Sequence, residues 1–235
     1  MTTIFANLQA VKSRILAAAL KAGRDPMDIR LLAVSKAWPA GAVREAASAG
    51  QREFGENYVR EAVEKVTSLA DLRLDWHFIG PLQSNKTRAV AEHFAWVHSI
   101  DRQKIAERLS EARGASRPPL QVCIQINVSG ERTKGGVAAE DLPSLAQSVA
   151  ALPNVTLRGL MAIPEPSQDM ALLRRRFATV RRLKEQLCQA GMNLDTLSMG
   201  MSDDLEAAIM EGATIVRVGT AIFGRRPGLG AGLAQ

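Results

Sequence analysis

Residues 29–36 read Ile-Arg-Leu-Leu-Ala-Val-Ser-Lys, a short and mostly apolar run that ends in two polar residues. Its length and its branched aliphatic side chains predict a buried β-strand, with Ser35 and Lys36 at the point where the strand leaves the sheet. A helical pattern begins soon afterwards, at Pro39. This stretch therefore predicts one strand–helix unit.

The same unit recurs along the chain, and most of the predicted strands end in polar residues. Strands are expected at residues 29–35, 53–54, 74–80, 96–100, 120–128, 156–163, 197–201 and 214–218. Helices are expected from residue 4 to a stop at Gly23, from Pro39 onward, and at residues 59–66, 86–94, 104–113, 141–152, 170–190 and 203–211. Alternation of this kind implies parallel strands that are joined by helical crossovers.

Eight strand–helix units in 235 residues fit one closed barrel with few insertions. The competing structure is a doubly wound open sheet, which often carries a glycine-rich phosphate turn after its first strand. Residues 34–39 contain no glycine at that position. The sequence therefore favours an α/β fold, a single (β/α)8 TIM barrel. We expect one domain over residues 1–235 and a flexible tail at residues 228–235, which are rich in Gly and Ala.

The composition is typical of a folded globular protein, with 46% hydrophobic and 23% charged residues. The two cysteines, Cys123 and Cys188, form no Cys-x-x-Cys or Cys/His pattern, which argues against a disulfide framework and against a metal site. No apolar run approaches the roughly 18 residues of a membrane span, and the first residues do not resemble a signal peptide. We therefore expect a cytoplasmic protein without a membrane partner.

The formal net charge of +6 favours anionic partners but does not choose among them. Part of the excess lies in residues 174–184, where Arg and Lys side chains alternate with apolar residues at helical spacing. A helix with a solvated basic face is the simpler interpretation of this stretch. A nucleic-acid-binding patch is the alternative, although an aromatic content of 4% argues against rows of base-stacking side chains.

In a TIM barrel the working residues gather at the carboxyl ends of the strands. The predicted ends carry a mostly polar set of residues: Lys36, Asn57, His77, His98, Asn127, Met161, Ser198, Ser202, Arg217 and Gly219. Lys36 stands out, because an amine held in a partly apolar barrel mouth can act as a nucleophile toward an aldehyde. The alternative is a lysine whose amine extends to the rim and stays in water.

A second signal lies on the last two strands. Ser202 precedes a predicted helix, where its hydroxyl and nearby backbone N–H groups can hold a phosphate. Gly219 follows the last strand and lets the backbone approach an anion closely. A helix cap and a turn would explain each feature separately. Arg217 faces the same side as Gly219, so it either brings a permanent charge to the barrel mouth or pairs with a buried acid.

Five stretches, in this order, resemble the pyridoxal phosphate homeostasis protein family. They are Ala-Val-Ser-Lys at residues 33–36, Phe-Gly-Glu-Asn-Tyr at 54–58, Trp-His-Phe-Ile-Gly-Pro-Leu-Gln-Ser-Asn-Lys at 76–86, Leu-Ser-Met-Gly-Met-Ser-Asp-Asp at 197–204 and Val-Arg-Val-Gly-Thr-Ala-Ile-Phe-Gly at 216–224. The resemblance extends from about residue 6 to residue 225. That family is similar in fold to the barrel domain of alanine racemase, which belongs to fold type III of the pyridoxal phosphate proteins.

The resemblance implies that Lys36 holds pyridoxal 5′-phosphate through a Schiff base. It implies that Ser202, Gly219 and Thr220 bind the phosphate. It also implies that Arg217 faces the pyridine nitrogen. The full set of implied cofactor-binding residues is Lys36, Asn57, His77, Ser198, Ser202, Arg217, Gly219 and Thr220.

The implied function is to bind and buffer pyridoxal phosphate and to deliver it to apo-enzymes, with no catalytic residues. A permanent cation at the ring nitrogen makes the ring a poorer electron sink. Racemisation needs acid–base groups on both faces of the substrate carbon, and the only tyrosine, Tyr58, is a weak candidate for the second. The alternatives are a small racemase that uses His77 or His98, and a nucleic-acid-binding protein. We expect a monomer, with a loop at residues 127–134 that flexes over the site.

Overall fold

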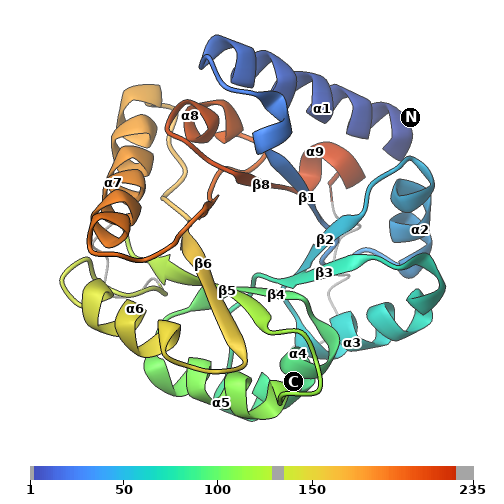
Figure 1. The fold of residues 1–235 in the computed structure, drawn as a ribbon. Helices are drawn as coiled ribbons and strands as arrows, with labels where there is room; N and C mark the ends of the chain where they lie inside the picture. Colours follow the sequence, from blue (N-terminus) through green and yellow to red (C-terminus); the bar gives the residue numbers. More distant parts are fainter. Residues whose placement is uncertain (1–2, 129–134, 226–235) are drawn as a thin grey trace, which may run out of the picture.

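The computed structural model describes residues 3–128 and 135–225, and within them eight strands close into one barrel (Figure 1). All neighbouring strands are parallel, and β8 pairs with β1. The strands are β1 (Arg30–Val34), β2 (Glu53–Glu56), β3 (Asp75–Phe78), β4 (Trp96–Ile100), β5 (Leu120–Ile126), β6 (Val155–Ala162), β7 (Thr196–Ser198) and β8 (Ile215–Val218). The predicted TIM barrel is confirmed. The predicted tail, and most of the loop predicted to flex, lie outside the described residues.

Helices surround the barrel on its outside (Figure 1). They are α1 (Ile4–Lys21), α2 (Ala40–Ser48), α3 (Val59–Ser68), α4 (Thr87–His93), α5 (Gln103–Arg113), α6 (Leu142–Ala150), α7 (Met170–Gln189), α8 (Leu205–Met210) and α9 (Thr220–Phe223), with single 3-10 turns at η1 (Pro26–Asp28), η2 (Ala70–Leu72) and η3 (Ser84–Lys86). Helix α1 precedes the first strand and packs against α8 and α9. No helix in the described part of the chain has the length and apolar character needed to span a membrane.

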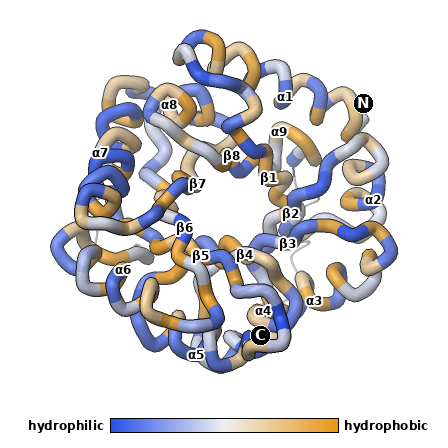
Figure 2. Tube along the Cα trace, viewed as in Figure 1, coloured by the Kyte–Doolittle hydropathy of each residue, from blue (hydrophilic) through white to orange (hydrophobic). Residues whose placement is uncertain are grey.

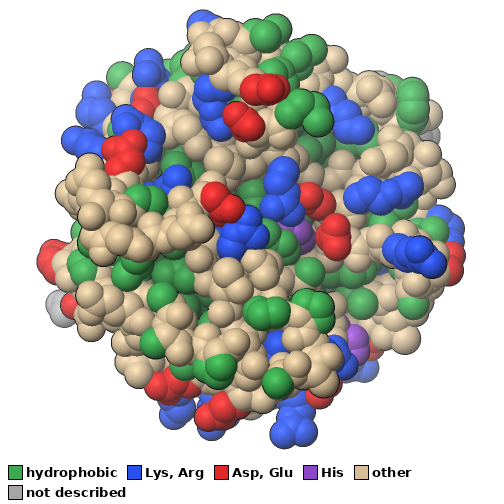
Figure 3. All heavy atoms as spheres, viewed as in Figure 1, with side chains coloured by type: hydrophobic (Ala, Val, Ile, Leu, Met, Phe, Trp, Pro, Cys, Tyr) green, Lys and Arg blue, Asp and Glu red, His purple; other side chains and the backbone are tan. Residues whose placement is uncertain are grey.

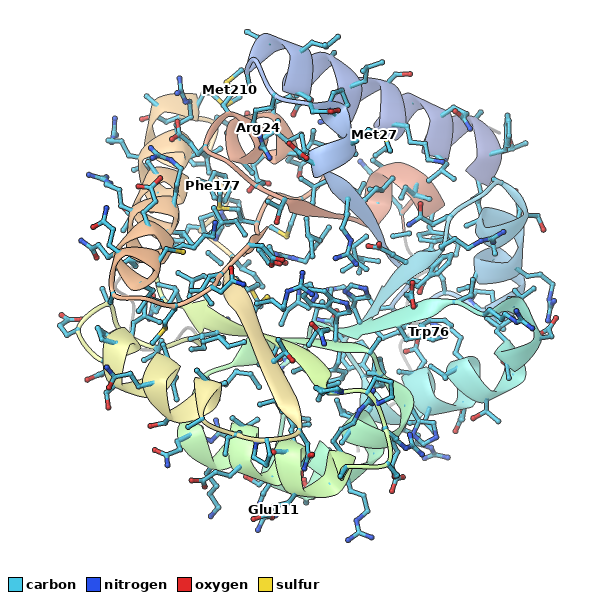
Figure 4. All side chains as sticks on the ribbon, viewed as in Figure 1. Arg24, Met27, Trp76, Glu111, Phe177 and Met210 are labelled. Atoms are coloured by element: carbon cyan, nitrogen blue, oxygen red, sulfur yellow. The ribbon has the colours of Figure 1, made fainter. Side chains whose placement is uncertain are left out.

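Apolar side chains form two cores, and the larger one lies between the strands and the surrounding helices. Phe177 is fully buried on α7 and points toward the barrel, whereas Glu111 points from α5 into the solvent (Figure 4). Hydrophobic and hydrophilic residues alternate along the helices, as expected for helices with one buried and one exposed face (Figure 2). Burial of one large apolar side chain contributes about 1.5–3 kcal/mol, so this ring of contacts supplies most of the driving force for closing the barrel.

The second core fills the inside of the barrel. It consists of Leu32, Val34, Ile79, Trp96, Cys123, Met161 and Ile215. The guanidinium groups of Arg30 and Arg158 lie 5.0 and 5.1 Å from the centre of the Trp96 ring. Burial raises the pKa of the Cys123 thiol to about 12, so this cysteine stays unreactive. The barrel interior is therefore packed with side chains rather than open as a pore.

Candidate functional site

A cavity of about 220 Å³ lies where the carboxyl ends of the strands meet. Most of its lining comes from the segments at or just after the ends of β1, β2, β3, β6, β7 and β8. The lining residues are Val34, Lys36, Trp38, Asn57, Ile79, Ile163, Met201, Ser202, Asp203, Arg217, Gly219, Thr220 and Gly224. Six of the eight predicted site residues are in this set. The structure therefore brings together Lys36, Asn57, Ser202, Arg217, Gly219 and Thr220.

Lys36 comes shortly after β1 on a tightly held backbone turn. The next residue, Ala37, has a φ of 61°, a left-handed conformation that costs a residue with a side chain about 1–2 kcal/mol. The N–H of Ala37 donates to Oε1 of Glu61 at 2.7 Å. On the other side of Lys36, Ser35 is fully buried. Both neighbours of the lysine are thus fixed by contacts that lie outside the cavity.

These contacts belong to a group of four side chains, Ser35, Glu56, Glu61 and Lys65, which we call the acid–lysine cluster. All are buried except Glu61, whose side chain is 34% exposed. Lys65 Nζ donates to Oε1 of Glu56 at 2.6 Å and to Oε1 of Glu61 at 2.9 Å. It also donates to the carbonyl of Ser35 at 2.9 Å, while the Ser35 hydroxyl donates to Glu56 at 2.6 Å. Burial raises the pKa of Glu56, and Lys65 and Ser35 oppose that rise. The cluster ties the end of β1 to β2 and α3.

Asn57 directly follows β2. Its Oδ1 is buried and accepts no hydrogen bond from any residue that the structure describes. The loop after β3 packs tightly on this residue, because a Cβ at Gly80 would lie only 2.2 Å from the Asn57 carbonyl oxygen. Ser99 Oγ holds that loop by donating to the Gly80 carbonyl at 2.6 Å. A buried acceptor at a cavity wall is suited to a hydrogen bond from a ligand or an ordered water.

The loops after β7 and β8 meet at the cavity. The hydroxyl oxygen of Ser202 accepts a hydrogen bond from the N–H of Ala221 at 3.4 Å, which joins the two loops. Helix α8 begins at Leu205, after its N-cap Asp204, whose Oδ1 accepts from the N–H of Met201 at 2.5 Å. Ser202 therefore lies before the cap, and its side chain faces the second loop instead of capping α8.

Gly219 ends the β8 segment, and Thr220 begins the short helix α9. A Cβ at Gly219 would lie 3.1 Å from the carbonyl oxygen of Val34, so glycine allows this loop to approach β1 closely. The first turn of a helix leaves backbone N–H groups without acceptors inside the helix. This loop therefore brings donors to the cavity at the point where Ser202 reaches it.

Helix α1 holds both loops from outside the barrel. Arg14 donates to the carbonyl of Ser202 at 2.9 Å and forms an ion pair with Glu206 at 2.9 Å. Seven residues earlier on the same helix, the Asn7 amide donates to the carbonyl of Ile222 at 2.8 Å. The helix that precedes the eight strand–helix units thus positions the two loops relative to each other.

Arg217 enters the cavity from β8 and is almost fully buried. Its Nη1 donates to the carbonyl and to Oγ of Ser198, at 2.5 and 2.7 Å, and its Nη2 donates to the carbonyl of Ala162 at 2.9 Å. None of these three acceptors is a carboxylate. Burial lowers the pKa of Arg217 to about 10, a shift that Asp204 opposes, so the guanidinium remains charged near neutral pH.

The remaining two predicted residues, Ser198 and His77, do not line the cavity. They lie beneath Arg217 in a series of contacts that also includes His98, and we call these three side chains the Ser–His–His chain. Ser198 Oγ is 2.7 Å from Nδ1 of His98, whose Nε2 is 2.9 Å from Nδ1 of His77. All three are fully buried, and the ring of His77 stacks on Trp96. His77 and His98 therefore lie inside the barrel rather than around its mouth.

Both imidazoles of this chain are neutral at ordinary pH. Burial lowers the pKa of His77 well below its usual value, and the neighbouring His98 and Arg30 add to the shift. Burial likewise lowers the pKa of His98, with further contributions from Arg217 and Arg30.

Sequence patterns miss several residues that line the cavity. Trp38 lies two positions after Lys36, and its ring stacks on Phe223 with the centroids 5.9 Å apart. Asp203 lines the cavity next to Ser202. In both cases a predicted site residue lies one or two positions away in the sequence, and that proximity is the signal that could have found them.

The basic stretch on α7 is largely paired with acids. Arg174 and Arg181 contact Glu211 at 2.7 and 3.4 Å, and Arg176 contacts Glu165 at 2.8 Å. On the face shown in Figure 3, basic and acidic side chains are intermixed and do not form a continuous basic surface. The structure therefore favours a solvated helix face over a nucleic-acid-binding patch.

The chain matches a protein-family model, curated relatives and solved structures. Residues 6–227 match the family model described as alanine racemase, N-terminal domain. The chain is 63% identical over 226 residues to a pyridoxal phosphate homeostasis protein of Pseudomonas aeruginosa, covering 96% of this chain and 97% of that protein. The chain is 53% identical over 234 residues to the Escherichia coli K12 protein of the same name, covering 96% of this chain and 98% of that protein. PipY of Synechococcus elongatus, solved with pyridoxal phosphate bound, matches with a TM-score of 0.80 at 41% identity, covering 91% of this chain and all of that one.

Proposed function

The chain belongs to the pyridoxal phosphate homeostasis protein family, built on the alanine racemase N-terminal domain, and from this premise we propose that it binds and buffers pyridoxal 5′-phosphate. The observation that carries the proposal is the meeting of Lys36, Arg217 and the two loops at one cavity. The structure of PipY with pyridoxal phosphate bound supports it, because PipY covers nearly the whole chain at 41% identity.

The residues of the cavity fit this ligand in three respects. Lys36 supplies an amine at the end of β1. Ser202 and the loop that begins at Gly219 supply a hydroxyl and backbone donors for a phosphate. Val34 and Ile79 provide apolar walls for a flat ring, and the unpartnered Oδ1 of Asn57 provides a polar contact at its edge.

Each of these groups has a definite task in holding the ligand. The bound cofactor supplies an aldehyde, an electrophile with which an amine condenses with loss of water. The Lys36 amine would be the nucleophile. Ser202 and the first turn of α9 would donate hydrogen bonds to the phosphate and so fix the orientation of the ring. Arg217 would present a permanent cation to the ring nitrogen and disfavour its protonation.

We propose storage and delivery to apo-enzymes rather than turnover of amino acids. Proton exchange on both faces of a substrate carbon needs a second acid–base group besides the lysine. Tyr58, the only tyrosine, is 55% exposed and is not among the cavity-lining residues. Asp203 lines the cavity but neighbours Ser202, at the end that we assign to the phosphate. The arrangement supports one covalent anchor with binding groups around it.

Absorbance of the purified protein, followed by borohydride reduction and peptide mapping, tests the proposal directly. We expect absorbance in the near-violet region and a pyridoxyl group on Lys36. Lys36→Ala should abolish both, whereas Lys104→Ala, which removes an exposed lysine of α5, should change neither. A colourless protein that fails to take up added pyridoxal phosphate would overturn the proposal.

Comparison of two aldehydes tests the phosphate contacts separately. Pyridoxal without its phosphate should bind about 100-fold more weakly, since two charge-assisted hydrogen bonds would be lost. Equal affinity for pyridoxal and its phosphate would contradict the assignment of Ser202 and Thr220.

A further inference from the structure

The Ser–His–His chain runs through the barrel interior beneath the cavity, where the proposed function uses neither histidine. It connects Arg217 to the apolar core inside the barrel through Ser198, His98 and His77, in contacts of 2.7, 2.7 and 2.9 Å. The far end, Nε2 of His77, is buried and has no partner among the described residues. A buried polar series of this kind costs free energy unless its hydrogen bonds are directed consistently.

The donor at one end fixes the direction of the whole chain. A guanidinium only donates, so Ser198 Oγ accepts from Arg217. The Ser198 hydroxyl proton is then free to point at Nδ1 of His98, its second partner. A neutral His98 that accepts at Nδ1 carries its proton on Nε2 and donates to Nδ1 of His77. His77 in turn carries its proton on Nε2.

The opposite direction leaves more groups unsatisfied. If His98 donated from Nδ1, the Ser198 hydroxyl proton would have no acceptor within the described contacts, and Nε2 of His77 would still lack a partner. Two buried polar groups would then be unpaired instead of one. Each such group costs about 1–3 kcal/mol, so the direction that runs away from Arg217 is favoured.

We propose that Ser198, His98 and His77 form a neutral, one-directional hydrogen-bond chain that positions Arg217 without itself supplying a counter-charge to the guanidinium. The chain offers lone pairs to the guanidinium but no negative charge. Ser198 and the histidines are positioning residues, because they act on the ligand only through Arg217. The inference rests on the proposed function for the identity of that ligand.

The proton positions can be measured without any ligand. In the ligand-free protein, nitrogen-15 and carbon-13 imidazole shifts should show both His77 and His98 as neutral tautomers with the proton on Nε2. Ser198→Ala should perturb the Nδ1 signal of His98. A proton on Nδ1 of His98, or a charged imidazole at neutral pH, would overturn the proposed direction whether or not pyridoxal phosphate binds.

Two ligands that differ at one atom test the positioning role. The wild-type chain should bind pyridoxal phosphate about tenfold more tightly than an analogue in which C–H replaces the ring nitrogen, a difference of one hydrogen bond to a charged donor. Ser198→Ala and His98→Leu should reduce this ratio toward one. His98→Asn, which retains an acceptor for Ser198, should preserve most of it.

The matched control is His93→Gln, because His93 lies on α4 outside the barrel and contacts the carbonyl of Ala89. It should leave the ratio unchanged. A merely structural defect would weaken both ligands equally, so a constant ratio in folded Ser198→Ala and His98→Leu proteins would refute the positioning role. If the wild-type chain takes up neither ligand, the proposed function fails, while the tautomer measurement still decides the direction of the chain.

Discussion

The two basic side chains of the cavity come from adjacent strands or the residues just after them, and the buried networks behind them differ in kind. Behind Lys36, at the end of β1, the acid–lysine cluster brings together three charged side chains. Behind Arg217, on β8, the Ser–His–His chain contains none. Since β1 and β8 pair directly, the contrast does not come from their location in the barrel.

The difference follows from what each network has to hold. The acid–lysine cluster acts on the backbone, through the Ser35 carbonyl and the Ala37 N–H, so its charges neutralise one another beside the site. The Ser–His–His chain acts on a side chain whose charge is itself the functional group. A carboxylate there would hold Arg217 equally well but would cancel its positive charge. Charged hydrogen-bond partners are thus present where the backbone must be fixed, whereas the hydrogen-bond acceptors of Arg217 are uncharged.

The largest expected effect comes from breaking the charged network. Lys65→Met should lower the free energy of unfolding by about 3–5 kcal/mol, because it leaves Glu56 buried without its cation. Urea unfolding at pH 7.5 measures this. Arg60→Met removes an exposed α3 pair with Glu64 and should cost less than about 0.5 kcal/mol. Equal losses in the two variants would mean that the cluster does not behave as a buried ion pair.

Lowering the pH changes the stability contributed by the two networks in opposite directions. The unfolded chain protonates histidine below about pH 6.5, whereas His77 and His98 stay neutral in the folded state. Their contribution to stability is therefore lost as the pH falls, by about 3 kcal/mol for both between pH 7.5 and 5.5. The raised pKa of Glu56 acts in the opposite sense: its contribution is present at low pH and is lost as the pH rises.

Unfolding free energies of the wild-type and His77→Leu proteins, measured across pH 5.5–7.5, test this. The variant should lose about half of the histidine-dependent slope, because one of the two imidazoles is gone. Identical slopes in both proteins would show that His77 is not neutral in the folded state.

Substituting one buried serine in each network compares the stability contributed by a single side chain of each. Ser35 donates to a carboxylate and Ser198 accepts from a guanidinium, and both side chains are fully buried. Ser35→Ala should cost about 2 kcal/mol, since a charge-assisted bond to Glu56 is lost. The bond from the Arg217 guanidinium to Ser198 is charge-assisted too, but Ser198→Ala should cost only about 1 kcal/mol, because the same Nη1 keeps its bond to the carbonyl of residue 198. A larger loss for Ser198→Ala than for Ser35→Ala in thermal unfolding would reverse the comparison.

Sequence patterns predict most of this fold because the burial of each strand and helix determines where apolar residues occur along the chain. The run before Lys36 is apolar because β1 is buried on the barrel, and its polar end marks the mouth. The same reasoning finds Gly219, where a Cβ would press on the Val34 carbonyl oxygen of β1 at 3.1 Å. It does not find α9, because four residues are too few to show a helical period.

The two networks escape prediction for a different reason. Alternation along a strand shows that His77 and His98 are buried, but their contact depends on the register between β3 and β4. The sequence indicates only that Lys65 lies on a helix. Its contact with Glu56 depends on how α3 packs against the end of β2. Lone strand histidines and helix lysines are common, so the sequence around each residue carries no sign of the contact.

The smallest expected effect concerns the strained turn at Ala37. Ala37→Gly should raise stability by about 0.5 kcal/mol, since glycine adopts a φ of 61° freely but loses more chain entropy on folding. Ala10→Gly, at an exposed position of α1, should lower stability by about 1 kcal/mol. If the acid–lysine cluster imposes the strain through Glu61, the gain should vanish when Ala37→Gly is combined with Lys65→Met. Additive effects of the two substitutions in urea unfolding would instead show that the turn is set by its own sequence, and that the charged network does not position the backbone beside Lys36.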